Sequence, residues 1–174
     1  MSIKDFMMRI KKVVGKTLVN EGESKIDEFL SKLEEKTKID YSRKFYLFSV
    51  APMGAVRMTY SDKWKTNPNH SNPKYRQRKA VTDYFHFKNE MAWQAKQMKY
   101  EMKNYLDALY CVPMPNSWTK KKKEQMNGLP CLSKPDLDNI TKAVKDSLKK
   151  DDSDVWFEKA EKRWSYFGAI IIYE

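Results

Sequence analysis

The sequence predicts an α+β fold, in which a small mixed β-sheet is flanked by helices and preceded by a helical N-terminal extension. Hydrophobic residues make up 41% of the 174 positions, enough to bury a core. Short runs of aromatic and branched residues, typical of strands, are interspersed with segments that show the helical period of three to four residues. The two kinds of segment do not alternate in a long βαβ series, which disfavours a doubly wound sheet.

Residues 1–40 form the predicted extension, and residues 41–174 the main domain. Asn20-Glu21-Gly22 divides the extension into two amphipathic helices, and Ser24 is suited to cap the second one. Because a helix pair of this size cannot bury both of its apolar stripes alone, we expect it to pack on the main domain or on another subunit.

The first half of the main domain contains a predicted strand, a polar loop and a long helix. The strand covers residues 45–50 and ends before Pro52, and the loop interleaves aromatic with basic side chains. The helix is expected over residues 76–103. We predict that it buries a stripe of apolar side chains: Val81, Tyr84, Phe85, Ala92, Ala95, Met98 and Met102.

The second half begins with a predicted strand over residues 105–112, which Pro113 closes. A basic connector that contains residues 120–123 leads to a helix over residues 138–148, whose apolar side chains are expected to bury against the sheet. A single final strand is expected over residues 163–173.

The charge balance favours a polyanionic partner. Lys and Arg number 34 against 23 Asp and Glu, which gives a net charge of +11 and an isoelectric point near 9.5. Nucleic acid is the simplest such partner, although many small basic proteins merely carry a solvated lysine surface. No run of about 18 apolar residues is present, so no membrane span is expected. The start of the chain lacks secretory-signal features, and two cysteines are too few for a disulfide scaffold, so we expect a cytoplasmic protein.

Acidic side chains nevertheless gather around the predicted helix at 138–148. Asp136 and Asp138 precede or open it, and Asp151 and Asp152 follow it. Each pair on its own is more often a helix cap or a solvated turn. If the segment after the helix folds back, the two pairs meet, and carboxylates about 4 Å apart repel each other by roughly 1 to 4 kcal/mol. A proton, a lysine or a divalent metal must then offset that repulsion.

Carboxylates without nearby histidine or cysteine favour Mg²⁺ or Mn²⁺ over zinc. His70 and His86 lie in unrelated segments, and the sequence has no phosphate-binding loop, nucleophile elbow or dinucleotide-binding loop. NTPases, serine hydrolases and enzymes with a nucleotide cofactor are therefore disfavoured. A metal held by acids inside a positive field suits phosphodiester hydrolysis.

At these residues the sequence resembles the RusA-type Holliday-junction resolvases. The resemblance rests on Asp136-Leu137-Asp138-Asn139, Lys142, Asp146-Ser147-Leu148 and the pair Asp151-Asp152, and it covers residues 42–174. The stretch Pro52–Thr59 also resembles the loop after the first strand in many members from phages. Residues 1–40 have no counterpart in the minimal form of the family.

The resemblance implies a homodimeric, Mg²⁺-dependent endonuclease of bacterial or phage origin that resolves four-way DNA junctions by paired symmetrical nicks. Mn²⁺ is an expected substitute for the native ion. Asp136, Asp138 and Asp152 would be catalytic acids and metal ligands, with Lys142 as the catalytic lysine. The choice between Asp151 and Asp152 as a metal ligand stays open.

We expect basic side chains to hold the DNA backbone. The candidates are Arg57, Arg78, Lys120, Lys121, Lys122 and Lys123. For the four lysines a solvated surface loop is an equal alternative. Trp64 and Trp118 are candidates for stacking on unpaired bases, or else belong to the core or a dimer interface. The rival function is a non-catalytic DNA-binding recombination accessory protein, in which the acids are only caps and turns.

Overall fold

The computed structural model describes residues 42–174, so the predicted helical extension at 1–40 lies outside the described residues. The described part divides into two compact units. The first holds residues 42–52, 105–133 and 155–174, and the second holds residues 53–104 and 134–154. Together they contain four strands and three α-helices, which confirms the α+β class. Within residues 42–174, no helix combines the length and the apolar character needed to cross a membrane.

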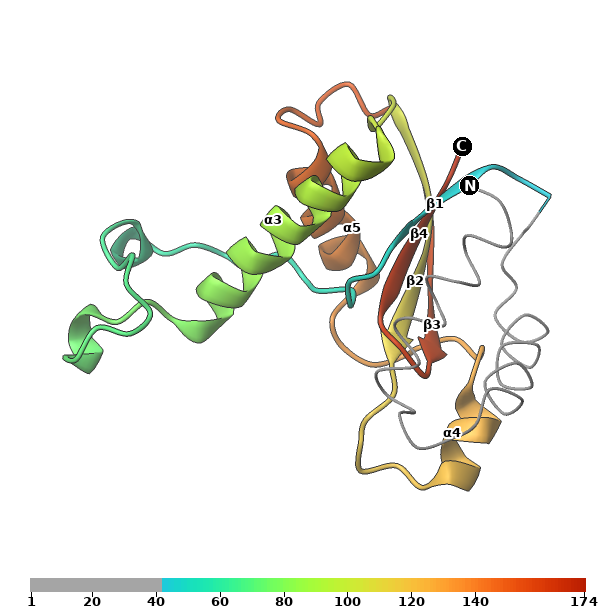
Figure 1. Cartoon of the computed structure of the whole chain (residues 1–174), viewed down its shortest axis with the longest axis horizontal. Helices are drawn as coiled ribbons and strands as arrows, with labels where there is room; N and C mark the ends of the chain where they lie inside the picture. The colour runs from blue at the N-terminus through green and yellow to red at the C-terminus, as the bar shows by residue number, and fades with distance from the viewer. Residues whose placement is uncertain (1–41) are drawn as a thin grey trace. The chain divides into compact units, whose positions relative to one another are not determined.

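The first unit is built on a four-stranded mixed sheet with the order β1-β4-β2-β3 (Figure 1). Strand β2 pairs in parallel with β3 and antiparallel with β4, and β4 pairs antiparallel with β1. The small mixed sheet is therefore confirmed. Its strands are β1 (Phe45–Phe48), β2 (Tyr105–Pro113), β3 (Phe157–Ser165) and β4 (Ala169–Tyr173).

The two central strands carry the core of this unit. Nearly every residue of β2 and all of β4 are buried, because both strands are almost continuously apolar. The one buried charge in β2, Asp107, is neutralised by Arg43, whose guanidinium nitrogen lies 2.7 Å from the carboxylate. The edge strand β3 is exposed over its first half, where charged residues protect it from pairing with other chains.

The prediction of one final strand over residues 163–173 is wrong, because the chain turns between β3 and β4. Gly168 lies so close to Ala51 that a β-carbon at this position would lie 2.5 Å from the Ala51 Cα. Only glycine allows that approach. The turn places β3 and β4 on opposite sides of β2.

The basic connector is also not a loop, since residues 120–123 open helix α4 (Lys120–Met126). The side chain of Thr119 caps this helix by accepting a hydrogen bond from the backbone N–H of Lys122. Trp118, just before the helix, packs on Trp164 with ring centroids 5.0 Å apart. The structure thus supports the core alternative for Trp118.

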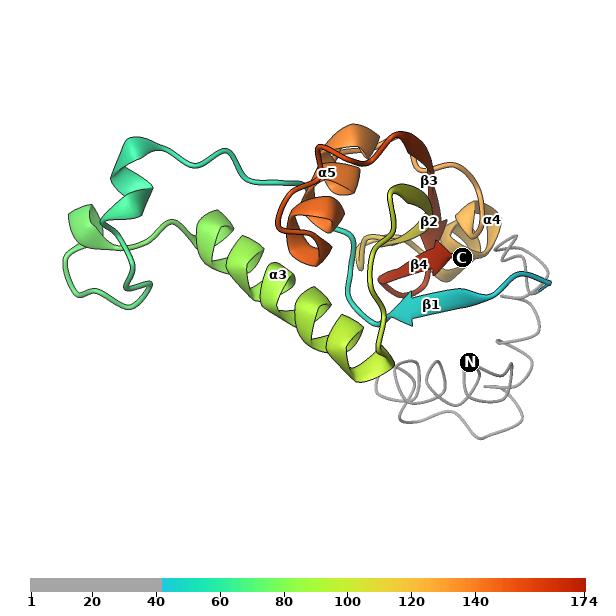
Figure 2. The same ribbon diagram turned by 90° about the horizontal axis from the view of Figure 1, so that it is seen from above.

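The second unit contains helices α3 (Lys79–Met98) and α5 (Leu137–Leu148), which pack against each other (Figure 2). Part of the predicted α3 stripe is wrong, because Phe85 and Ala92 are exposed whereas Phe87 and Met91 are buried. Aromatic and apolar residues occur on several sides of α3, so periodicity alone does not determine which side is covered. The buried residues of α3 are Val81, Tyr84, Phe87, Met91 and Ala95, and those of α5 are Ile140, Thr141, Ala143 and Val144.

Helix α3 is shorter at both ends than predicted. Arg78 has an extended backbone and serves as the N-cap. At the other end Lys99 takes a left-handed conformation with φ of 52°, which stops the helix. The N–H groups of Lys99 and Tyr100 then donate to carbonyls in the last turn.

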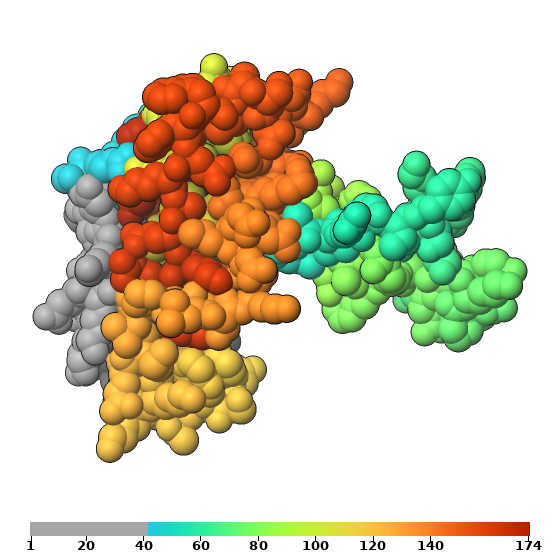
Figure 3. Space-filling view, turned by 180° about the vertical axis from the view of Figure 1, so that it is seen from behind, coloured from blue at the N-terminus to red at the C-terminus, as the bar shows by residue number. Residues whose placement is uncertain are grey.

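Residues 57–78, which we call the arm, connect to the N-terminal end of α3 and stand away from that helix (Figures 2 and 3). The arm contains two short 3-10 helices, η1 (Tyr60–Lys63) and η2 (Pro73–Tyr75). Its one buried side chain is polar, that of Asp62. Polar contacts therefore hold the arm together in place of an apolar core.

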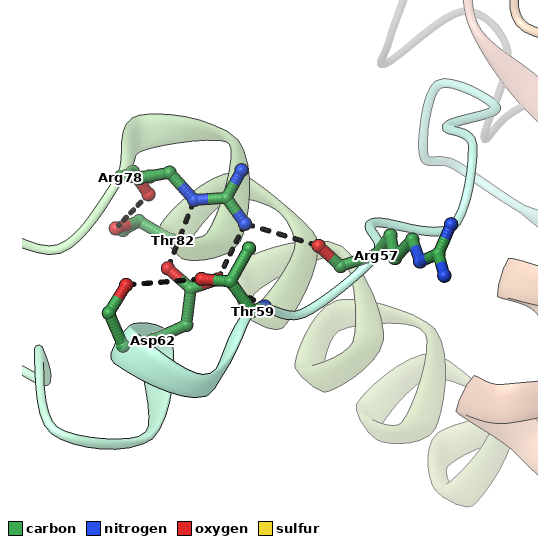
Figure 4. Close-up of polar contacts among 6 residues, drawn as sticks. Arg57, Thr59, Asp62, Arg78 and Thr82 are labelled. Carbon is green, nitrogen blue, oxygen red and sulfur yellow. Dashed lines mark hydrogen bonds and ion pairs between the residues drawn. The ribbon is translucent and has the colours of Figure 1, made fainter.

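The base of the arm is closed by Arg78 and Asp62 (Figure 4). The Arg78 Nε and Nη2 donate to the two Asp62 oxygens at 3.0 and 2.6 Å, respectively. The same Nη2 also donates to the Arg57 carbonyl. The backbone N–H and hydroxyl of Thr59 each donate to Asp62 at 2.7 Å. Arg78 and these Thr59 groups hold the pKa of Asp62 far below its usual range.

The rest of the arm is shaped by asparagine turns. The side-chain oxygens of Asn67 and Asn72 accept from backbone N–H groups two residues later, and the Asn67 carbonyl accepts from Gln77 at 3.1 Å. The hydrogen bond between Gln77 and Asn67 joins the end of the arm to its first half. The two chain segments of the arm are therefore connected at Asn67 as well as at the base.

We predict that Asp62→Asn loosens the arm, because the amide cannot replace the charge that Arg78 binds. Limited trypsin digestion at neutral pH should cut after Lys63 and Lys65 several-fold faster, with the unfolding midpoint nearly unchanged. Asp83→Asn, which removes an exposed ion pair with Lys79 within α3, is the matched control. Unchanged digestion of Asp62→Asn would contradict this role.

Acidic pH should loosen the arm in the same way as Asp62→Asn. Because the folded pKa of Asp62 is lowered, its stabilising contribution is complete above the ordinary aspartic acid pKa of about 3.9 and is lost as the pH falls below it. Between pH 5 and 9 the contact between Arg78 and Asp62 should stay intact.

Candidate active site at the start of helix α5

The start of α5 presents two carboxylates that make no hydrogen bond or ion pair within residues 42–174. Asp136 is the N-cap of the helix, and its carbonyl accepts the first helical hydrogen bond from Ile140, but its side chain makes no capping bond. Asp138 follows in the first turn, and both residues are exposed. Simple capping, the alternative for an Asp-x-Asp pair, does not account for the side chain of Asp136.

Asp136 and Asp138 are unusual among the aspartates of residues 42–174. Within that part of the chain the carboxylates of these two alone have neither a hydrogen bond nor an ion pair. The other seven are each bound by a basic side chain or a backbone N–H: Asp62, Asp83, Asp107, Asp146, Asp151, Asp152 and Asp154. In a chain of net charge +11, two adjacent unpaired acids are therefore a specific feature of this helix end.

A loop holds the start of α5 in place. The backbone N–H of Ala55 donates to the Asn139 carbonyl at 3.0 Å. A β-carbon on Gly54 would lie 2.7 Å from the Asn139 side-chain nitrogen and 3.0 Å from the Pro135 Cβ, so glycine is required for this close approach. The sequence indicated this loop only as part of the family resemblance, and its contact with α5 was not predicted.

Lys142 lies one turn further along α5 and is held by Asp146. Its ammonium nitrogen lies 3.3 Å from one Asp146 oxygen, and the Tyr84 hydroxyl donates to the other at 2.8 Å. Burial and then the hydrogen bond to Asp146 raise the pKa of Tyr84 well above its usual value, so its hydroxyl remains a donor. The role of Tyr84 was not predicted, because Tyr84 lies 62 residues from Asp146 in the sequence.

The acids after α5 are placed differently. An oxygen of Asp152 lies 3.6 Å from the Lys145 ammonium nitrogen, so a lysine neutralises it. Asp151 accepts a hydrogen bond from the Ser153 backbone N–H, which forms a turn and lowers the pKa of Asp151. This is the turn role that the alternative interpretation gave to Asp151. Asp154 is bound by Lys149.

No group of three His, Cys, Asp or Glu side chains within residues 42–174 is arranged to hold a metal ion. The expected gathering of Asp136 and Asp138 with Asp151 and Asp152 is thus not seen among these residues. Two carboxylates at one helix end still fit Mg²⁺, which binds through one or two carboxylates and completes its shell with water and substrate phosphates. Asp136 and Asp138 have the oxygen donors and the exposure for this.

The predicted DNA-binding residues lie in both units. Arg57 is exposed, whereas the Arg78 guanidinium is engaged by Asp62 at the base of the arm. Lys122 lies over the Trp118 ring, with its ammonium nitrogen 4.2 Å from the ring centroid. The remaining α4 lysines are mostly exposed: Lys120, Lys121 and Lys123.

We predict that Tyr84→Phe lowers the free energy of unfolding by about 1.5 to 3 kcal/mol, the cost of losing a hydrogen bond to a charged acceptor. Urea denaturation at pH 7 measures this, with the exposed Tyr60→Phe as a control. Because the pKa of Tyr84 is raised, wild-type stability should also fall as the pH rises above about 10, and Tyr84→Phe should lack that part of the loss. Equal stability of the variant and the wild type at pH 7 would contradict the bond to Asp146.

Comparison with known families gives a match over most of the chain. A family model described as Endodeoxyribonuclease RusA matches residues 52–172, which include α5 and every acid discussed above. Neither a curated protein nor a solved structure gives a significant match. The chain therefore belongs to the RusA family of endodeoxyribonucleases, enzymes that hydrolyse phosphodiester bonds of DNA.

Proposed function

We propose that this endodeoxyribonuclease resolves four-way DNA junctions by paired symmetrical nicks, as a homodimer that requires Mg²⁺. The observation that carries the proposal is the unpaired state of Asp136 and Asp138 within the described residues of a strongly basic chain. The helix dipole stabilises negative charge near the N-terminus of a helix. Asp136 and Asp138 are therefore suited to hold a divalent cation.

Each residue near the start of α5 has a separate task in this proposal. Asp136 and Asp138 bind the cation, with Asp152 as a further candidate ligand. When bound, the cation supplies hydroxide near neutral pH and stabilises charge on the phosphate and the leaving oxygen. Lys142 neutralises phosphate oxygens from one helical turn away. Asp146 holds the Lys142 ammonium group, and Tyr84 holds Asp146.

The α4 lysines have a placement that helix stability does not explain. Lys120, Lys121 and Lys122 occupy the first turn of the helix, where the helix dipole disfavours positive charge, whereas Lys123 lies in the last turn. Phosphate binding gives these side chains a function that outweighs this cost. The same positions account for part of the affinity for branched DNA in our proposal.

A dimer gives the paired nicks a physical basis. A four-way junction has approximate twofold symmetry, so two identical sites related by a twofold axis can cut opposed strands and leave ends that can be ligated.

We predict that Asp138→Asn abolishes nicking of a synthetic four-way junction in Mg²⁺, with at least a 100-fold loss of rate. Binding of the same junction in EDTA should be retained or tightened, because the substitution removes a charge that repels phosphate. Denaturing gels measure cutting and gel shifts measure binding. Asp154→Asn, whose carboxylate is bound by Lys149, is the matched control and should cut at the wild-type rate.

A joint loss of cutting and binding by Asp138→Asn would point to a folding role and contradict the assignment. Wild-type protein that cuts equally well in Mg²⁺ and in EDTA would contradict the metal requirement. Nicks that fall at unrelated positions on opposed strands would contradict paired action by a dimer.

We also predict that junction affinity falls steeply with salt. Changing the four α4 lysines to glutamine should lower the slope of log affinity against log salt by about 0.9 for each phosphate that the variant no longer neutralises. Three of the four charges lie in the first turn and are unfavourable to α4, so the change should not destabilise the helix. Lys96→Gln, on α3, is a control. An unchanged slope would support the solvated-surface alternative.

A further inference from the structure

The arm (residues 57–78) carries three large aromatic side chains that are mostly exposed within the described structure. Tyr60 and Trp64 are each 74% exposed and Tyr75 is 53% exposed. A segment of this size usually covers its aromatic rings, because their burial is a main source of stability. Several uncovered rings on one segment are typical of a binding surface.

The arm holds these rings on a hydrogen-bonded frame. Asp62 fixes the start of η1 through Thr59 and ties it to Arg78, and the Asn67 carbonyl ties the first half of the arm to Gln77. Neither Tyr60 nor Trp64 contributes to those bonds. The two rings are therefore presented by the arm without being required for its structure.

The charge of the arm identifies the kind of partner. The arm has six basic residues and one acidic residue, Asp62, whose charge Arg78 already neutralises. Basic side chains also accompany the rings. The Lys63 ammonium nitrogen lies 5.9 Å from the centre of the Tyr60 ring, and that of Lys74 lies 5.8 Å from the centre of the Tyr75 ring.

An uncovered ring next to an ammonium group matches a nucleotide, which offers a base to stack and a phosphate to neutralise. Proteins bind single-stranded nucleic acid by this combination of aromatic rings and a positive surface. Paired bases are already stacked inside the duplex, so the rings of the arm suit unpaired bases. An acidic partner without bases would use the lysines and leave the rings exposed.

We propose that the arm binds unpaired nucleotides of DNA, with bases stacked on Tyr60 and Trp64 and phosphates neutralised by Lys63 and Lys65. The choice of DNA as the partner rests on the proposed function, because the centre of a branched junction is where base pairs open. The arm then acts in recognition of the branch point, apart from the chemistry at the start of α5.

The test compares two fluorescein-labelled probes of equal length and charge: a single-stranded oligonucleotide with bases, and the same backbone with abasic sites throughout. Fluorescence anisotropy in EDTA gives the affinity without cutting. Wild-type protein should bind the probe with bases more tightly. Trp64→Ala should weaken that binding by roughly 5- to 150-fold, the range for loss of one stacked base, and leave binding of the abasic probe unchanged.

Two further variants separate stacking from structure. Trp64→Phe keeps an aromatic face and should retain most of the affinity for bases. Trp93→Ala removes an exposed tryptophan from α3 and should leave both probes unaffected. If Trp64→Ala weakens both probes equally, or neither, the proposal is overturned. It is also overturned if the variant changes the sedimentation of the free protein while DNA affinity stays the same, since a second copy of the chain would then cover the arm.

Failure of this inference is distinguishable from failure of the proposed function. If Trp64 contributes to binding of the probe with bases in EDTA, the proposed role of the arm is supported, even if the wild type nicks no junction in Mg²⁺. The opposite outcome is also possible to recognise. If the wild type cuts junctions but Trp64→Ala binds both probes as tightly as the wild type, the inference is overturned and the proposed function stays intact.

Discussion

Two carboxylates that remain unpaired in a strongly basic chain are the constraint on which the functional account depends. Within residues 42–174 the other aspartates are neutralised by lysine or arginine or bound by a backbone N–H, so pairing is the rule for the aspartates of this part of the chain. Asp136 and Asp138 depart from that rule at the same helix end. Their charge is then available for a cation that arrives with the substrate or before it. A helix N-terminus favours nearby negative charge, and the absence of a capping bond leaves the Asp136 oxygens accessible.

The surroundings of α5 keep this arrangement in place. The loop at Gly54 and Ala55 fixes the first turn through Asn139. Asp146 binds Lys142 one turn further along, and Tyr84 on α3 binds Asp146. The candidate catalytic lysine is thus held by an acid that is itself held by a neighbouring helix. A hydrogen-bonded chain of this kind limits the positions that the ammonium group can take.

Much of the fold could be predicted from local pattern, and the exceptions have physical causes. Strand β2 and helix α5 are continuous apolar or periodic segments with clear ends, and they were predicted almost to the residue. The turn at Gly168 depends on its approach to Ala51, which is distant in sequence. Lys120, Lys121 and Lys122 open α4, where the helix dipole disfavours positive charge, and from the sequence this short helix was interpreted as a basic connector. The start of α3 at Lys79 follows from the bond between Arg78 and Asp62, 16 residues apart, which no local pattern indicates.

Within the site the acids and Lys142 could be named from their motif, while Tyr84 could not, because its role arises only from the packing of α3 on α5.

The central claim is that Asp136 and Asp138 bind a divalent cation. The most direct measurement is an anomalous difference map from crystals of the protein soaked in manganese chloride, with crystals of an Asp136→Asn, Asp138→Asn double variant beside them. The account predicts a peak at the start of α5, within coordination distance of both carboxylates, that the double variant lacks. A map without a peak there, or a peak that persists in the double variant, would contradict it.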